Sequence, residues 1–230
     1  MPAGEVAVVI PARNEADRIE ATVTAALGLP KAGLVLVVDD GSTDDTAARA
    51  AQAGAAVMRH ARNRGKGAAM ETGAEAVRLL DRDEPEPRHL LFLDADLGES
   101  AGRAGPLAEP VLAGTADMTI AVFTNIVKLG GHGRVVKLSR AGIKRATGWE
   151  PRQPLNGQRC LTRAAFEAAR PLAAGFGVET ALTIDLMRKG MRVTEVEVDL
   201  AHRATGTDLR AQLHRARQLA DVAWALAVRR

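Results

Sequence analysis

The stretch LVLVVDDGSTDDTAARA, residues 34–50, contains the pattern that decides the fold. An apolar run over residues 34–38 ends at Asp39 and Asp40, and a Gly-Ser turn then leads into an alanine-rich helical pattern. A run that is apolar at every position is typical of a strand buried on both faces, as in parallel sheets covered by helices. The stretch therefore predicts a strand, a turn and a helix of an α/β protein.

The same alternation continues on both sides of this stretch. In the first half we expect strands at 6–10, 34–39, 55–58 and 89–93, helices at 16–26, 44–53 and 66–80, and a charged loop at 81–88. In the second half we expect loops at 130–133 and 150–158, helices at 134–146, 164–170, 178–189 and 209–228, and strands at 159–161 and 193–200. Because the sequence has no repeat and no low-complexity linker, its 230 residues predict a single domain with one mostly parallel central sheet and helices on both faces.

The composition excludes several classes of protein. A hydrophobic fraction of 47% with 26% charged residues is that of an ordinary globular domain. Only 3% of the residues are aromatic, and 31 basic residues oppose 28 acidic ones, so we expect no nucleic-acid partner. The single Cys160 rules out an intramolecular disulfide framework. No signal peptide and no apolar run of membrane-spanning length is recognisable, so we expect a cytoplasmic protein.

Ligands of parallel sheets bind beyond the carboxyl ends of the strands, and acidic residues follow two of the expected strands. Asp94-Ala95-Asp96 follows the run at 89–93, where two carboxylates can approach one Mg²⁺ or Mn²⁺ ion that also binds a diphosphate. Asp39-Asp40-Gly41-Ser42 offers acceptors for the N–H groups of a base or the hydroxyls of a ribose. An ordinary turn with a helix cap is the alternative.

A basic, glycine-rich segment, Arg64-Gly65-Lys66-Gly67, precedes the helix expected at 66–80. Backbone N–H groups and an ammonium group at that place favour a phosphate. The spacing is not that of a Walker A loop, and no G-x-G-x-x-G follows the first strand, which disfavours a dinucleotide cofactor.

The segments VVIPARNE, VVDDGSTDDT, RNRGKGAA and LFLDADLGES occur in the order found in glycosyltransferases of the GT-A fold that use nucleotide-diphosphate sugars, and they resemble family 2 in particular. The resemblance implies a GT-A, Rossmann-like fold with a nucleotide-binding half, residues 1–128, and an acceptor-binding half, residues 129–230. It also implies a metal-binding DxD motif at residues 94–96. The implied nucleotide-binding residues are Pro11, Ala12, Arg13, Glu15, Asp40, Ser42, Lys66, Asp94 and Ala95.

The second half resembles that of glucosyl-3-phosphoglycerate synthases in its segments GRV (133–135), QPLNG (153–157), GFGVE (175–179) and AHR (201–203). The sequence departs from that pattern at Val136, Gln158 and Ala204, which bears on the acceptor. The Gly-Phe-Gly segment at 175–177 places Glu179 near the expected substrate cleft, and we expect Glu179 to be the catalytic carboxylate. The resemblance implies that His202 completes the metal site of Asp94 and Asp96, that Asn156 and Gly157 approach the sugar, and that Arg134 holds an acidic acceptor.

Together these features predict an enzyme that moves a hexosyl group, from UDP-glucose or a similar donor, to a small phosphorylated or carboxylated acceptor such as 3-phosphoglycerate, with Mg²⁺ or Mn²⁺. One alternative is transfer to a polyprenyl phosphate at the membrane surface, and another is a catalytically silent subunit that binds nucleotide sugars. The closing helix at 209–228 is basic and amphipathic. A homodimer and a peripheral contact of this helix with the inner face of the membrane therefore stay open.

Overall fold

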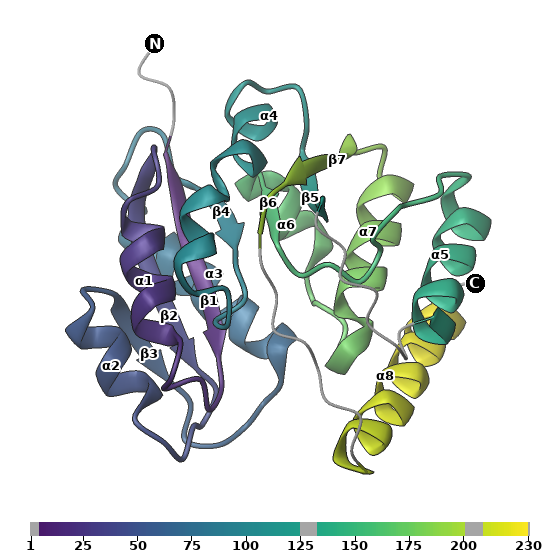
Figure 1. The fold of residues 1–230 in the computed structure, drawn as a ribbon. Helices are drawn as coiled ribbons and strands as arrows, with labels where there is room; N and C mark the ends of the chain where they lie inside the picture. The colour runs from purple at the N-terminus through teal and green to yellow at the C-terminus, as the bar shows by residue number, and fades with distance from the viewer. Residues whose placement is uncertain (1–4, 125–132, 201–208, 230) are drawn as a thin grey trace.

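The computed structural model is an α/β domain built on one seven-stranded sheet (Figure 1). It describes residues 5–124, 133–200 and 209–229, with residues 209–215 described by their backbone only. Within the described residues, no helix has the length and apolar character needed to cross a membrane. The α/β class expected from the sequence, with one mostly parallel sheet and helices on both faces, is confirmed.

The sheet combines six parallel strands with one antiparallel strand. Its order is β3-β2-β1-β4-β6-β5-β7, and β6 runs antiparallel to both of its neighbours. Because β6 lies between β4 and β5, it joins the first four strands to β5 and β7 in one continuous sheet. The strands are β1 (Val6–Ala12), β2 (Ala32–Asp39), β3 (Ala56–Arg59), β4 (His89–Phe92), β5 (Met118–Phe123), β6 (Arg159–Leu161) and β7 (Val193–Val198).

Helices cover both faces of the sheet (Figure 1). The α-helices are α1 (Ile19–Leu27), α2 (Thr46–Gln52), α3 (Lys66–Leu80), α4 (Glu109–Leu112), α5 (Gly133–Thr147), α6 (Arg163–Ala169), α7 (Val178–Arg188) and α8 (Leu209–Val228). The short 3₁₀ helices are η1 (Gly98–Arg103), η2 (Gly105–Leu107) and η3 (Gly175–Gly177).

Because the strands are apolar at successive positions, the domain has a hydrophobic core on each face of the sheet. Along β1, Val8 and Ile10 pack into the core on one face, and Ala7 and Val9 pack into the core on the other. All four side chains are buried, because side chains alternate between faces and each face carries helices. The sequence pattern thus fixes β1 in the interior of the sheet.

The predicted elements agree with the structure in type, and the bounds of α3, β6 and α8 are those expected. Strand β5 and the short helices between β4 and β5 were not predicted, although β5 is an apolar run buried at all but its last position. Helix α1 begins at Ile19, three residues later than expected, since residues 13–18 form a turn held to the start of α2.

Close packing at Gly73 of α3 joins this helix to the sheet. A Cβ atom at this position would lie 2.4 Å from Cγ1 of Val9 and 3.2 Å from Cγ2 of Val38. Both valines are fully buried, so neither has room to move away.

We therefore expect Gly73→Ala to lower the free energy of unfolding by about 1–3 kcal/mol, although alanine favours helix more than glycine. Chemical denaturation measures this value. Gly105→Ala is the matched control, because a Cβ at Gly105 meets no atom within 4 Å. Equal stability of the two variants would contradict close packing at Gly73.

Candidate functional site

The carboxyl ends of β1 and β2 are tied together by short polar side chains. The amide of Asn14 donates to Oγ of Ser42 at 3.0 Å, and Oδ1 of Asn14 accepts from the amide of Thr43 at 2.9 Å. The amide of Glu15 donates to Oγ1 of Thr46 at 2.9 Å. Asn14 has a φ of 55°, a conformation that asparagine tolerates better than most residues. These hydrogen bonds therefore hold the turn after β1 and the turn after β2 in one fixed arrangement.

Asp40, the first residue after β2, organises the glycine-rich loop that precedes α3. Its carboxylate accepts from the amides of Arg64 and Gly65, each at 2.8 Å, and lies 2.7 Å from Nδ1 of His60. Burial alone would raise the pKa of Asp40, but the hydrogen bonds from His60 and the two amides lower it. Asp40 is therefore an anion whose oxygens hold the loop that leads into Lys66.

Lys66 forms ion pairs with two other residues that the sequence analysis singled out, Asp94 and Glu179. Its Nζ lies 2.7 Å from Oδ1 of Asp94 at the end of β4 and 3.0 Å from Oε1 of Glu179 at the start of α7. Burial would lower the pKa of Lys66, but the charges of Asp94 and Glu179 and their hydrogen bonds raise it. The ammonium group therefore stays charged, and it joins the first half of the chain to the second.

The loop before β6 closes over this ion-pair cluster. Nε2 of Gln158 donates to Oδ2 of Asp94 at 2.7 Å, so each oxygen of Asp94 has a donor. A Cβ atom at Gly157 would lie 2.2 Å from Nζ of Lys66 and 3.0 Å from Oδ1 of Asp94, so a larger residue here would displace the ammonium group from its ion pair. Asn156 holds the loop by accepting from the amide of Gln158 at 3.0 Å.

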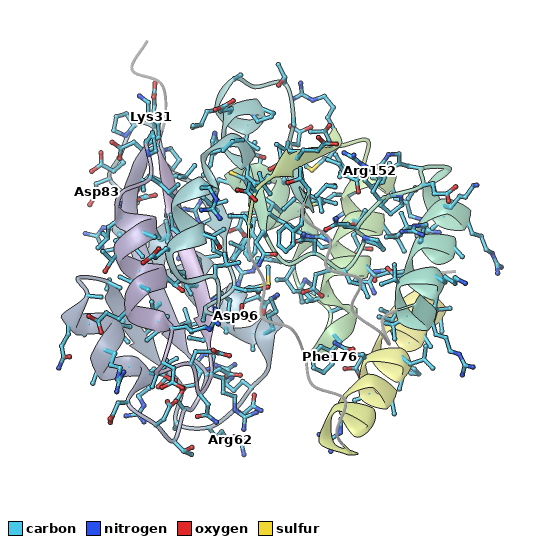
Figure 2. All side chains as sticks on the ribbon, in the orientation of Figure 1. Lys31, Arg62, Asp83, Asp96, Arg152 and Phe176 are labelled. Carbon is cyan, nitrogen blue, oxygen red and sulfur yellow. The ribbon has the colours of Figure 1, made fainter. Side chains whose placement is uncertain are left out.

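Helix α1 fixes the turn that carries Asp96. Oγ1 of Thr22 donates to the carbonyl of Ala95 at 2.8 Å, and Nη1 of Arg18 donates to the carbonyl of Asp96 at 3.2 Å. Asp96, labelled in Figure 2, is half-buried. Among the described residues no three histidine, cysteine or acidic side chains gather into a metal site. Two carboxylates at a strand end nevertheless suit a hard cation that takes its other ligands from a diphosphate.

Arg159 is a site residue that the sequence analysis missed. Its side chain is fully buried and donates to the carbonyls of Asn156 (2.9 Å) and Pro154 (3.0 Å) and to Oγ1 of Thr183 on α7 (2.9 Å). Burial lowers the pKa of Arg159 to about 10, against the opposing effect of the negative charge of Glu179. Arg159 thus joins the loop over the cluster to the helix that carries Glu179. An arginine inside a three-residue strand was the only sequence signal.

The other predicted site residues lie around this cluster or outside the described residues. Ala12 is buried, Pro11 and Glu15 are half-buried, and Arg13 is exposed at the end of β1. Arg134 is exposed on the first turn of α5, and its role toward an acceptor stays a prediction. His202 lies outside the described residues, and its metal-binding role also stays a prediction.

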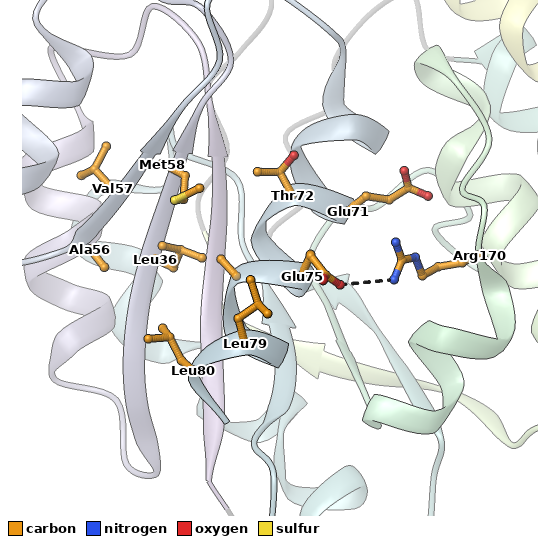
Figure 3. Close-up of a pocket in the computed structure, with 11 residues that line it drawn as sticks. Leu36, Ala56, Val57, Met58, Glu71, Thr72, Glu75, Leu79, Leu80 and Arg170 are labelled. Atoms are coloured by element: carbon orange, nitrogen blue, oxygen red, sulfur yellow. Dashed lines mark ion pairs between the residues drawn. The ribbon is translucent and has the colours of Figure 1, made fainter. Parts of the chain in front are cut away.

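A cavity of about 540 Å³ lies away from this cluster, between β3 and α3 (Figure 3). Its walls are mainly apolar, and Arg170 forms an ion pair with Glu75 at its rim, with 3.6 Å between Nη1 and Oε2. None of the predicted site residues lines this cavity. Its volume therefore does not identify it as the chemical site.

Comparison with known proteins matches residues 7–169 to the family described as Glycosyl transferase family 2. Glycosyltransferase AglJ of Haloferax volcanii is 30% identical over 211 residues, which cover 88% of this chain and 65% of that protein. Glucosyl-3-phosphoglycerate synthase of Mycobacterium tuberculosis is 31% identical over 208 residues, which cover 78% of this chain and 60% of that protein. The chain therefore spans less than two thirds of the length of these relatives.

Solved structures give the same relation over nearly the whole chain. A crystal structure of the mycobacterial synthase with Mn²⁺, uridine diphosphate and phosphoglyceric acid has a TM-score of 0.79 at 26% identity, covering 98% of this chain and 78% of that chain. Another structure of that synthase, with Mg²⁺ and uridine diphosphate, has a TM-score of 0.74 at 25% identity, covering 97% of this chain and 80% of that chain.

The neutral side chain of Gln158 is expected to matter for stability. A glutamate at this position would bring a second carboxylate against Asp94, and two carboxylates so close retain one proton between them. That raises the upper pKa of the pair in the folded state above its value in the unfolded chain. The free energy of unfolding of the variant therefore falls as the pH rises from the pKa of the unfolded chain to the raised pKa of the folded state.

We expect Gln158→Glu to match the wild type near pH 5 and to lose about 1–3 kcal/mol of unfolding free energy by pH 8. Urea denaturation at both pH values measures the loss. Gln52→Glu, at an exposed position of α2, is the control for added charge. If both variants depend on pH in the same way, Gln158 does not contact Asp94 as described.

Proposed function

This chain belongs to glycosyl transferase family 2, and from that premise we propose that it transfers a hexosyl group from a nucleotide-diphosphate sugar to an acceptor hydroxyl, with Mg²⁺ or Mn²⁺. The observation that carries the proposal is the cluster of Lys66, Asp94 and Glu179. In it the charged ammonium group of Lys66 lies beside the acidic residue that follows the buried strand β4. Such a site suits a reaction in which negative charge develops on a leaving diphosphate.

The donor is assigned to the carboxyl ends of β1, β2 and β4. We propose that the turn of Pro11, Ala12, Arg13 and Glu15 and the turn at Ser42 frame the base and ribose. The hydrogen bonds between these turns support this, because they fix both segments without a ligand. Asp40 acts toward the nucleotide by holding the loop before Lys66, since its oxygens already accept from that loop.

The metal is assigned to Asp96 and Asp94, with His202 as the third protein ligand. Carboxylate oxygens suit Mg²⁺ and Mn²⁺, and the mycobacterial synthase was crystallised with each of these ions. When bound, the ion would neutralise the diphosphate. The chain's own contribution is to orient Asp96 through Arg18 and Thr22, and Asp94 through Lys66 and Gln158.

In the proposed reaction, the bond between the anomeric carbon and the diphosphate oxygen breaks, and a bond between that carbon and the acceptor oxygen forms. The acceptor hydroxyl loses its proton to a base, the role we give to Glu179. A bound diphosphate competes for Lys66, which now pairs with Glu179 at 3.0 Å. Donor binding would therefore release the Glu179 carboxylate for the acceptor.

For the acceptor we favour a small phosphorylated or carboxylated molecule such as 3-phosphoglycerate, held by Arg134 with Asn156 and Gly157 near the sugar. Phosphoglyceric acid in the complex of the similar mycobacterial synthase supports this class. Transfer to a polyprenyl phosphate is the alternative, because it also presents a phosphate to Arg134. A silent binding subunit is the remaining candidate, and measurable transfer of a labelled hexose would exclude it.

Asp96→Asn tests the metal assignment. Replacing the carboxylate by an amide removes a charge without changing the size of the side chain, so we expect Mn²⁺ to stop enhancing the affinity for uridine diphosphate. Isothermal titration with and without Mn²⁺ measures the enhancement. Asp83→Asn, at a position with an 84% exposed side chain, should behave as the wild type. An unchanged enhancement in Asp96→Asn would remove this residue from the metal site.

Arg134→Lys tests the acceptor assignment. Lysine keeps the charge but loses the planar fork that binds phosphate or carboxylate, so we expect KM for the acceptor to rise about tenfold, roughly 1.4 kcal/mol, with donor KM unchanged. Steady-state kinetics with 3-phosphoglycerate and with a polyprenyl phosphate in detergent separate the two acceptor classes. Arg82→Lys, on an exposed loop, is the control. An acceptor KM equal to that of the wild type for both substrates would refute the role of Arg134.

A further inference from the structure

Helix α8 presents two apolar faces, of which only one is covered. Val222 and Ala225 are buried against the rest of the domain. The other apolar face is a stripe along the last turns of the helix, with the spacing of a single helical face. We call it the outer stripe, and it consists of the exposed residues Leu219, Ala220, Ala223, Trp224, Ala227 and Val228.

The outer stripe exposes large apolar side chains to solvent. Trp224 is 72% exposed and Val228 is 64% exposed. A large aromatic side chain in that position leaves apolar area in contact with water, and such area marks a surface that binds a partner. The sequence analysis identified this helix as basic and amphipathic and left a membrane contact and a homodimer open, but it did not separate the covered apolar face from the exposed one.

The outer stripe lies directly beside positive charge. A pocket of about 350 Å³ opens between α5 and α8, and its walls include Ala223 and Ala227 of the outer stripe together with Arg145 of α5 and Arg188 of α7. Helix α5 carries five basic residues and no acidic one over Gly133–Thr147. In Figure 1, α5 and α8 lie side by side at the edge of the domain away from β3.

The described acidic residues near this face are already engaged. Asp185 holds the guanidinium of Arg229 through two hydrogen bonds of 2.7 Å each, and Asp221 accepts from the amide of Phe176 at 3.0 Å. Glu150, beyond the end of α5, pairs with Lys144 at 2.5 Å. Their charges therefore offset Arg229 and Lys144, while Lys137 and Arg145 remain exposed on α5.

We propose that the outer stripe, together with the exposed Lys137 and Arg145 of α5, binds the surface of a bilayer that contains anionic lipids. A tryptophan ring suits the boundary between headgroups and acyl chains, and arginine and lysine bind the lipid phosphates. A second copy of the chain fits this face less well, because a two-fold contact would bring the basic residues of α5 against themselves. The inference is independent of the transferase activity, since Trp224, Lys137 and Arg145 have no role in the donor, metal or acceptor sites proposed above.

Sedimentation with lipid vesicles tests the proposal on the full chain. We expect the wild type to sediment with phosphatidylcholine vesicles that contain phosphatidylglycerol, and much less with phosphatidylcholine alone. Raising the salt concentration should weaken the binding, because ions screen the attraction. Trp224→Ser and Arg145→Glu should each lower the bound fraction at least about fivefold. Leu80→Ser, on the exposed side of α3, is the matched control and should bind as the wild type.

Tryptophan fluorescence gives a second readout. Trp224 and Trp149 are the two tryptophans, and Trp149 is half-buried. Anionic vesicles should shift the emission of the wild type to shorter wavelength and leave that of Trp224→Phe unchanged. Equal binding to neutral and anionic vesicles, or no binding to either, would overturn the proposal. So would a wild-type dimer that Trp224→Ser converts to a monomer, because a second copy would then cover the outer stripe.

Discussion

The ammonium group of Lys66 lies between two carboxylates that come from different halves of the chain. Asp94 follows strand β4 in the first half, and Glu179 lies in the first turn of α7 in the second. A cation so placed compensates both negative charges, and removing it would leave the buried carboxylate of Glu179 and the half-buried carboxylate of Asp94 to repel each other. The loop at Gly157 and the turn at Ala173, whose carbonyl would lie 2.8 Å from a Cβ on Gly67, therefore have to fit closely around the start of α3.

The position of this ammonium group follows from several weaker constraints. Asp40 fixes the loop before it, and Gly73 lets α3 approach β1 closely enough to direct its first turn at the end of β4. On the opposite side, Arg159 supports the loop that covers the cluster. Each contact alone contributes little, but together they leave Lys66 few alternative positions. Such preorganisation is what a site needs when its reaction depends on placing charge beside a leaving group.

Much of this arrangement could be predicted from the sequence, because strong local patterns determine it. Apolar runs ending in acidic turns indicated the parallel strands and the position of Asp94, and the helical period over Lys66–Leu80 indicated α3. Strand β5 was missed because no distinctive turn residue drew attention to its apolar run. Arg159 and the outer stripe were missed because their meaning depends on neighbours distant in sequence. No local pattern reveals that an arginine is buried against Thr183, or that one face of α8 stays uncovered.

The antiparallel insertion of β6 has a consequence for how the chain acquires its structure during synthesis. Strands β1 to β4 can pair as soon as they leave the ribosome, but the second edge of β4 stays open until β6 has been made. Strand β5 is made earlier than β6 and has no partner at all until β6 and β7 follow. During the synthesis of α5 the growing chain thus carries two apolar strands with unpaired edges, one edge of β4 and both edges of β5, and such edges are where nascent chains associate. The native topology therefore makes the middle of the sequence the segment most in need of chaperone protection.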